Sequence, residues 1–472
     1  MSMKKLLILL NCLILIFSLC VPAFAAEAEE DKVKTKGEYY DIEAPDYETG
    51  IALLVETNTD TVIYSKNADK ITAPASLTKL VTAMVVLDEC KDLQKEITCS
   101  YDAIHSLDGT GSSVAGLIVD EKTTLEMLLY CLLLPSANDA AAVLAEEFGD
   151  GKPENFVAKM NAFVQELGCK NTHFANAHGL DDESIKGFDS DSQNRTTASD
   201  MYLIAKKALE NDTISAMSSE YDRYMTPTNK SEKRLLINTN ALTNPFSEYH
   251  YEDAIGLKTG TTDKAGACLI TSAEKDGYTY IAIAMKGERE KEIDGKVYNT
   301  AFLMCRYMLR WAFQNIKMST VADENYILGE VGVEFGRGAD YVGLVSKVPV
   351  ANVIHKDLNI DDLTVKLSDG FPETVDSPIE KGESVGKAQL MYKDVVIADV
   401  DLVAYQTVKK NYLWAMFSWI EGIATSKAFI VVLLVVIVVI IVLWFGTKNQ
   451  RDRKKRRKQR VDVVKDYSKL AK

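Results

Sequence analysis

Three short motifs contain side chains that could together transfer an acyl group to and from a serine. Ser76–Lys79 reads Ser-Leu-Thr-Lys, Ser136–Asn138 reads Ser-Ala-Asn, and Lys258–Thr261 reads Lys-Thr-Gly-Thr. A serine hydroxyl becomes a good nucleophile when a base removes its proton, and a lysine amine can act as that base only in its neutral form. The residue types therefore indicate a serine nucleophile that is activated by a lysine.

The spacing of the first motif distinguishes Ser76 from other serines that also precede a lysine by three residues. Ser76 follows Pro74 and begins a run with apolar residues at helical spacing, so Ser76 and Lys79 are expected on one helix face. The start of such a helix also offers backbone N–H groups to a developing oxyanion. The competing serines lie in an apolar leader or in strand-like and turn-like surroundings: Ser2, Ser272 and Ser384.

A neutral Lys79 requires a lowered pKa. Apolar surroundings and a second cation both disfavour the ammonium form of a lysine. Lys258 of the third motif is the natural second cation. We therefore expect Lys258 to lie close to Lys79, although the two residues are far apart in the chain.

The second motif lies on the connection between an apolar segment, residues 127–134, and a helix expected at residues 139–147. The Ser136 hydroxyl could relay a proton to a leaving amine, and the Asn138 amide could hold Lys79 or the substrate. Serine and asparagine also commonly cap helix N-termini. Taken alone, the motif fits the capping interpretation better.

The third motif ends a strand expected at residues 254–259. Gly260 would let a substrate backbone approach this strand. Lys258, Thr259 and Thr261 could bind a carboxylate. Without the other two motifs, a charged strand end before a turn explains the same residues equally well.

The elements that must position these motifs alternate between two periodicities. A β-hairpin is expected at 51–64, helices at 76–87, 153–168 and 298–316, and successive antiparallel strands at 254–259, 267–272 and 278–285. The pattern predicts an α/β (α+β) catalytic domain at 46–316: one antiparallel sheet covered by helices, with its first and last strands adjacent. Shorter alternations, clearest at 363–367 and 395–397, predict a small all-β domain at 318–406.

Both ends of the 472-residue chain carry membrane signals. Residues 1–25 have the order of a secretory signal peptide. Residues 428–446 contain no charge and would form a helix of about 28 Å, enough to span a bilayer core. An interfacial amphipathic helix is expected at 411–427, and the basic tail at 447–472 is expected on the cytoplasmic side. The sequence thus predicts a single-pass protein of the cell membrane with an extracytoplasmic catalytic domain.

Charge and cysteine content exclude several classes of function. The chain carries a net charge of −14; the leader contributes +2 and the tail +9, which leaves −25 for residues 26–446. An extracytoplasmic part so acidic does not suit nucleic acid, and the basic run at 451–458 is better explained by its position beside the span.

Six cysteines follow the leader, and we expect buried free thiols, with Cys90–Cys99 as the most plausible disulfide. No Cys/His cluster has the spacing of metal ligands, so neither a metal nor another cofactor is expected.

The three motifs, in this order, resemble those of penicillin-binding proteins and serine β-lactamases. Their surroundings resemble the low-molecular-mass D-alanyl-D-alanine carboxypeptidases over residues 46–404. The matching segments are Ala75–Leu80, Asn171–Phe174, His178–Asp181, Thr197–Met201, Gly256–Gly260 and Ser377–Gly382.

This resemblance implies the hydrolysis of peptidoglycan stem peptides and covalent inhibition by β-lactam antibiotics. It implies that Ser76 forms the acyl-enzyme, Lys79 is the base, and Ser136 with Asn138 relays the proton and positions the reacting groups. It further implies that Lys258 and Thr259 bind the terminal carboxylate, and that the backbone N–H groups of Ser76 and Thr261 form the oxyanion hole.

Two features of the chain depart from the family. Well-studied members often have His where this chain has Thr261, and we expect this to change substrate preference without loss of activity. Members usually hold the membrane by an amphipathic helix, whereas here a true span is expected after it. His178 resembles a catalytic base, but a histidine that packs within a loop is the more common arrangement.

Two rival functions share the motifs. A β-lactamase would need a Glu-x-x-x-Asn loop after the second motif, but Glu166 and Asn171 are five residues apart instead of four. A penicillin-sensing receptor would need an output domain, and the tail of 26 residues is too short for one. The sequence therefore favours a D-Ala-D-Ala carboxypeptidase.

Overall fold

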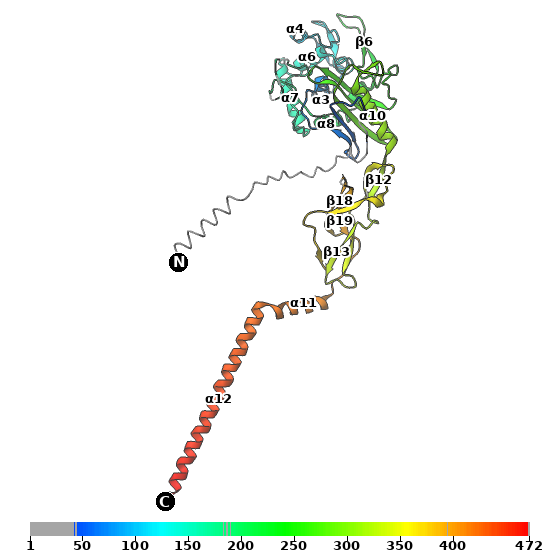
Figure 1. Cartoon of the computed structure of the whole chain (residues 1–472). Helices are drawn as coiled ribbons and strands as arrows, with labels where there is room; N and C mark the ends of the chain where they lie inside the picture. The colour runs from blue at the N-terminus through cyan, green and yellow to red at the C-terminus, as the bar shows by residue number, and fades with distance from the viewer. Residues whose placement is uncertain are drawn as a thin grey trace, which may run out of the picture. The chain divides into compact units, whose positions relative to one another are not determined.

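In a computed structural model of the chain, the described residues are 42 and 45–470, apart from 183, 186, 189 and 394. The predicted signal peptide lies outside them. Internal contacts divide the chain into two compact units. The first contains the chain up to Val321 together with 350–366 and 389–399, and the second contains the remainder (Figure 1).

The first unit is built on a five-stranded antiparallel sheet with the strand order β2-β1-β9-β8-β7. This sheet confirms the prediction in three respects: it contains the β1–β2 hairpin, it contains the three later strands, and its first strand in the chain pairs with its last. In that pair, Leu53 lies opposite Ile283. The strands are β1 (Ile51–Glu56), β2 (Thr61–Lys66), β7 (Ala254–Thr262), β8 (Gly266–Lys275) and β9 (Tyr278–Gly287).

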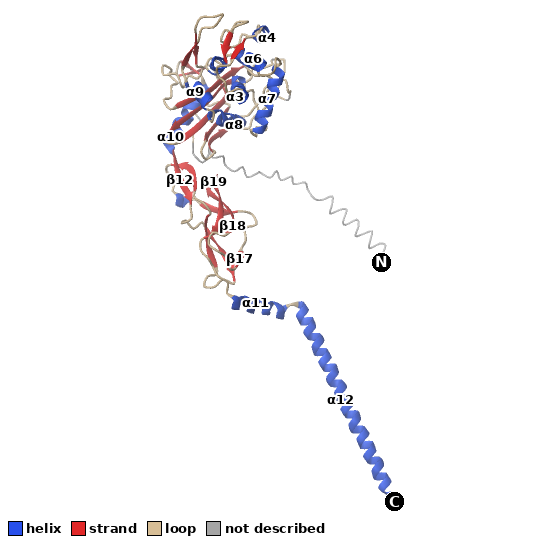
Figure 2. Ribbon diagram, turned by 180° about the vertical axis from the view of Figure 1, so that it is seen from behind, coloured by secondary structure: helices blue, strands red, loops and turns tan. Residues whose placement is uncertain are grey.

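Helices cover both faces of this sheet (Figure 2). Alternate residues of β1 belong to different hydrophobic cores, because successive side chains of a strand point to opposite faces. Leu53 packs in the larger core with most of the helices, and Leu54 packs in the smaller core with α10. The main helices are α3 (Lys79–Glu89), α5 (Leu125–Leu133), α6 (Asn138–Glu147), α7 (Pro153–Glu166), α8 (Ala198–Leu209), α9 (Asp212–Ser219) and α10 (Thr300–Asn315).

Short elements complete the surface of this unit. They are α4 (Tyr101–His105) and three two-stranded ribbons: β3 (Glu96–Thr98) with β4 (Lys122–Thr124), β5 (Asp222–Met225) with β6 (Arg234–Ile237), and β10 (Lys291–Ile293) with β11 (Lys296–Tyr298).

The segment after α10 is rich in strands, as predicted. A six-stranded sheet has the order β16-β18-β19-β14-β13-β17, and β12 pairs separately with β15. The strands are β12 (Ile316–Ala322), β13 (Gly329–Glu334), β14 (Tyr341–Ser346), β15 (Val350–His355), β16 (Thr364–Leu367), β17 (Thr374–Asp376), β18 (Ser384–Tyr392) and β19 (Val395–Ala404).

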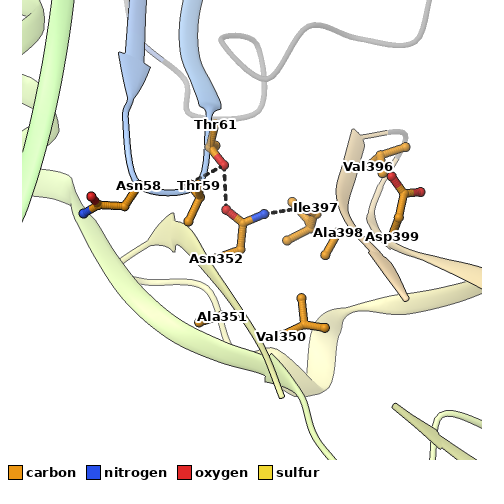
Figure 3. Close-up of a pocket in the computed structure, with 10 residues that line it drawn as sticks. All are labelled: Asn58, Thr59, Thr61, Val350, Ala351, Asn352, Val396, Ile397, Ala398 and Asp399. Carbon is orange, nitrogen blue, oxygen red and sulfur yellow. Dashed lines mark hydrogen bonds between the residues drawn. The ribbon is translucent and has the colours of Figure 1, made fainter. Parts of the chain in front are cut away.

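Contacts assign part of this β-rich segment to the first unit. The Thr61 hydroxyl donates to Asn352 Oδ1 at 2.6 Å, and the Asn352 amide donates to the carbonyl of Ile397 beside a pocket (Figure 3). The compact units therefore do not coincide with the ranges 46–316 and 318–406, which remain a prediction about domains.

Two helices end the described chain, α11 (Tyr412–Thr425) and α12 (Lys427–Leu470). The apolar part of α12 makes it a candidate membrane span, and the aromatic residues of α11 are exposed. The predicted span at 428–446 forms part of α12, but the helix does not end there. It continues through the basic tail, where lysine, arginine and glutamine are good helix formers and no proline interrupts the chain.

The six cysteines that follow the leader are free thiols, and all but Cys90 are buried. This confirms the expectation of free thiols, whereas the predicted Cys90–Cys99 disulfide is wrong. Cys90 lies at the C-terminal end of α3 with its sulfur 3.7 Å from the carbonyl of Asp92, and the side chain of Cys99 packs in the larger core.

Candidate active site

Ser76 lies in a 3-10 turn, η1 (Ala75–Thr78), that leads directly into α3. The turn begins with Ala75 at a φ of +49°, and it is closed by a hydrogen bond of 2.8 Å from the Thr78 hydroxyl to the Ala75 carbonyl. An α-helix was expected to start at Ser76. The structure shows a tighter 3-10 turn at Ser76, and the α-helix starts at Lys79. The spacing of three residues still places Ser76 and Lys79 on one face, because side chains three apart eclipse in this geometry.

The Lys79 amine is the centre of the site. Its Nζ donates to Ser76 Oγ at 2.8 Å, to Asn138 Oδ1 at 2.5 Å and to the carbonyl of His178 at 2.7 Å. The side chain is fully buried. Burial, and then the charge of Lys258, lower the pKa of Lys79 well below its usual value, and the negative charge of Asp139 opposes them. The amine can therefore be neutral while it contacts the serine hydroxyl.

Asn138 and Ser136 take positions that the capping interpretation does not explain. Ala137 is the N-cap of α6 and makes no side-chain hydrogen bond to the helix, while the Asn138 amide oxygen is directed to Lys79. Ser136 has a φ of +62°, which is uncommon for a serine. Its hydroxyl is buried and finds no hydrogen-bond partner among the described residues. An unsatisfied buried hydroxyl of this kind is free to donate a hydrogen bond to a ligand or to accept one from it.

The third motif forms the end of β7, an edge strand of the sheet. Lys258 is buried, and its Nζ donates to the carbonyl of Thr259 at 3.1 Å. Burial lowers the pKa of Lys258 to about 7. Thr261 is exposed at the end of the motif.

Gly260 allows β7 to approach η1, the turn that carries Ser76. A Cβ at this position would lie 3.0 Å from Ala75 Cβ and 3.1 Å from the backbone nitrogen of Ser76. The structure thus brings all three motifs together, as the sequence predicted, around the Ser76 hydroxyl.

Other residues of the site were not recognised from the sequence. The Thr239 hydroxyl lies 2.5 Å from that of Thr259, and the backbone N–H of Thr239 donates to the carbonyl of Leu134 at 3.0 Å. Thr239 therefore connects the C-terminal end of α5, two residues before the second motif, to Thr259 of the third. No local pattern marks a single threonine between two asparagines, so only the fold could reveal this contact.

His178 contributes its backbone and not its ring to the contact with Lys79. The His178 ring accepts the backbone N–H of Leu180 at 3.1 Å, and burial and the nearby Lys79 lower its pKa to about 3. This geometry agrees with a histidine that packs within its loop. The next residue, Gly179, has a φ of +89°, and a Cβ there would lie 1.9 Å from the Ala75 carbonyl oxygen. The loop can therefore approach η1 only with glycine at this position.

The described residues do not provide the water-activating pair that a β-lactamase would need. Glu166 lies at the exposed end of α7, and Asn171 is exposed, so they do not form the water-activating pair of a β-lactamase. Among the described residues, no group of three or more His, Cys, Asp or Glu side chains could hold a metal ion.

Comparisons with known proteins agree with this geometry. The profile of the D-alanyl-D-alanine carboxypeptidase family matches residues 39–289, and that of the penicillin-binding protein 5 C-terminal domain matches residues 317–410. D-alanyl-D-alanine carboxypeptidase DacF of Bacillus subtilis is 28% identical over 364 residues, which cover 77% of this chain and 87% of the relative.

Two further relatives extend this similarity. D-alanyl-D-alanine carboxypeptidase DacA of Escherichia coli is 30% identical, over 63% of this chain and 68% of the relative. The crystal structure of penicillin-binding protein 5 from Haemophilus influenzae superposes with a TM-score of 0.55 at 25% identity, covering 78% of this chain and 100% of that one. The chain therefore belongs to the D-alanyl-D-alanine carboxypeptidase family, the serine peptidases of the penicillin-binding protein 5 type.

Proposed function

We propose that this protein removes the terminal D-Ala from peptidoglycan stem peptides through an acyl-enzyme on Ser76. Neutral Lys79 takes the proton of the Ser76 hydroxyl, and Ser76 Oγ bonds to the carbonyl carbon of the penultimate D-Ala. The backbone N–H groups of Ser76 and Thr261 stabilise the oxyanion of the tetrahedral intermediate. Lys258 and Thr259 hold the carboxylate of the terminal D-Ala.

Collapse of the intermediate breaks the bond between the carbonyl carbon and the nitrogen of the terminal D-Ala. The leaving amine receives the proton that Lys79 took, and the Ser136 hydroxyl relays it while Asn138 keeps Lys79 in place. A water molecule then attacks the ester, the bond to Ser76 Oγ breaks, and the serine recovers its proton. The products are D-Ala and the shortened peptide. A β-lactam antibiotic acylates the same serine and acts as a covalent inhibitor.

The observation that carries this proposal is the contact of 2.8 Å between Lys79 Nζ and Ser76 Oγ. A fully buried amine with a lowered pKa is suited to be a base for a serine beside it. The orphaned hydroxyl of Ser136 supports the relay, since it has an unused hydrogen-bonding capacity beside the motif that holds Lys79.

The direct test incubates the purified protein with a peptide that ends in D-Ala-D-Ala and measures the D-Ala released. We expect release by the wild type and none above background for Ser76→Ala. Ser384→Ala is a matched control, because this serine also precedes a lysine by three residues but is exposed on β18, so its loss should leave the release unchanged. Undiminished release by Ser76→Ala would refute the assignment of the nucleophile.

We also propose a topology for the chain. Residues 1–25 act as a signal peptide, the catalytic domain at 46–316 and the β-rich domain at 318–406 lie outside the membrane, and α11 lies at its surface. The apolar part of α12 then crosses the bilayer, and the basic residues that follow remain in the cytoplasm. The candidate span in α12 supports this arrangement. Protease added to intact cells should remove the catalytic domain and spare a C-terminal tag; digestion of the tag would contradict the proposed topology.

A further inference from the structure

Asp139 is a buried carboxylate that directly follows the second motif and has no place in the reaction proposed above. It is the second residue of α6 and is 3% exposed. Its Oδ1 accepts the backbone N–H groups of Ala115 and Ala140 at 2.9 Å, and its Oδ2 accepts that of Leu117 at 3.0 Å. Both carboxylate oxygens of Asp139 are therefore engaged by backbone donors, two of which belong to another segment of the chain.

These hydrogen bonds hold the segment Ser113–Leu117 against the site. This segment has no regular secondary structure, so neither a helix nor a strand ladder fixes its position. It is tied a third time at its start, where the Ser113 carbonyl accepts the backbone N–H of Asn138 at 2.8 Å. Asp139 and the backbone of Asn138 therefore fix the segment to the turn that carries Ser136.

Asp139 also acts on Lys79 by its charge. The titratable groups that act on the Lys79 amine are Lys258 of β7, Asp139 of α6 and the His178 imidazole, which is neutral because its pKa is lowered to about 3. Lys258 lowers the pKa of Lys79, and Asp139 raises it. The two charges thus have opposite effects on the same amine.

We propose that Asp139 is a positioning residue of the active site, which holds Ser113–Leu117 against the Ser136 turn and counterbalances the charge of Lys258 at Lys79. The hydrogen bonds of Asp139 to the segment, here called the clamp, and the effect of its negative charge on Lys79 are two independent consequences of one side chain. A carboxylate that only stabilised the N-terminus of α6 would contribute to folding, but it would not change the pH at which the serine is acylated.

The proposal rests on the acylation of Ser76 proposed above, and one experiment separates the two. The rate of acylation by a fluorescent penicillin is measured as a function of pH for the wild-type protein and for Asp139→Asn. In the variant, the amide nitrogen that replaces one oxygen cannot accept a backbone N–H, so we expect the maximal rate to fall about tenfold as the segment moves. Loss of the negative charge of Asp139 favours the neutral form of the Lys79 amine. The rising limb of the curve of acylation rate against pH should therefore move to lower pH.

Glu121→Gln is the matched control. Glu121 is also fully buried and accepts the backbone N–H of Ile118 at 2.9 Å, next to the same segment, but it is not among the groups whose charges shift the pKa of Lys79. We expect a lower rate and a limb at the wild-type pH. Asp139→Glu, which keeps the charge but alters the clamp, should behave in the same way and can be measured even if Asp139→Asn does not fold.

The possible results discriminate clearly. A limb that stays at the wild-type pH in Asp139→Asn, or one that moves equally in Glu121→Gln, would overturn the role of the charge. If Asp139→Asn does not fold, a displaced limb in Asp139→Glu would overturn the proposal. Failure of the proposed function itself would give a different result: the fluorescent penicillin would label Ser76→Ala as well as it labels the wild type.

Discussion

The close contact between Gly260 and η1, the turn that carries Ser76, predicts how much Gly260→Ala should slow the acylation of that serine. The new Cβ would lie 3.0 Å from Ala75 Cβ and 3.1 Å from the nitrogen of Ser76, whereas carbon atoms in contact prefer about 3.5–4.0 Å. Either β7 or η1 must then move by about 0.5 Å. Because a misplacement of about 1 Å can cost roughly 100-fold in rate, we expect acylation of Ser76 to slow by about tenfold.

The assay measures the second-order rate of acylation by a fluorescent penicillin, together with the melting temperature. Overpacking typically destabilises a fold by about 1–3 kcal/mol, so the melting temperature of Gly260→Ala should fall as well. Gly329→Ala is the control, since a Cβ at Gly329 of β13 meets no atom within 4 Å and the backbone is not left-handed. A Gly260→Ala protein that acylates at the wild-type rate would refute the requirement for this close approach.

Three other predictions follow from the described contacts. Lys258→Met should abolish carboxylate binding, yet it should stabilise the fold at pH 7 by up to about 4 kcal/mol. Because the pKa of Lys258 is lowered to about 7 in the folded state, this gain in stability over the wild type should shrink between pH 7 and 10.5 and vanish above pH 10.5. Thermal denaturation measured as a function of pH would show this dependence. Thr239→Val removes the hydroxyl beside Thr259 and should raise KM for a D-Ala-D-Ala peptide about tenfold, whereas Thr239→Ser should restore it; equal values for all three proteins would contradict the role of this contact. A thiol reagent should label Cys90 in the folded protein and the buried cysteines only after denaturation; rapid labelling of Cys268 in the folded state would contradict its burial.

The sequence predicted the catalytic sheet well because periodicity and burial agree there. The three later strands are long and apolar, and each matches its expected range to within a few residues. The β5–β6 ribbon was not predicted, because each of its strands has only four residues. Helix α8 was not predicted either, although it has 12 residues and buries one face. The continuation of α12 through the basic tail was also missed, because charged residues were interpreted as a tail and not as a helix.

The candidate site divides in the same way. The types and order of the motif residues identified Ser76, Lys79 and Lys258, because the chemistry of a lysine base requires these groups wherever they lie in the chain. The alternative roles for Ser136 and Asn138 could not be distinguished by local sequence, since the same residues favour a helix cap. The structure adds one contact that a helix cap does not explain, the hydrogen bond from Lys79 Nζ to Asn138 Oδ1.

The motifs in the sequence therefore sufficed to predict the chemistry proposed for this protein: a serine nucleophile, a lysine base and a strand that would bind a carboxylate, in a fixed order. Which further backbone and side-chain groups surround Lys79 and Thr259 could be seen only in the folded chain. The carbonyl of His178, the hydroxyl of Thr239 and the carboxylate of Asp139 reach the site from segments whose local patterns are unremarkable. The physical reason is that the pKa and position of Lys79 depend on burial and on charges brought together by folding, and these are properties of the packed chain.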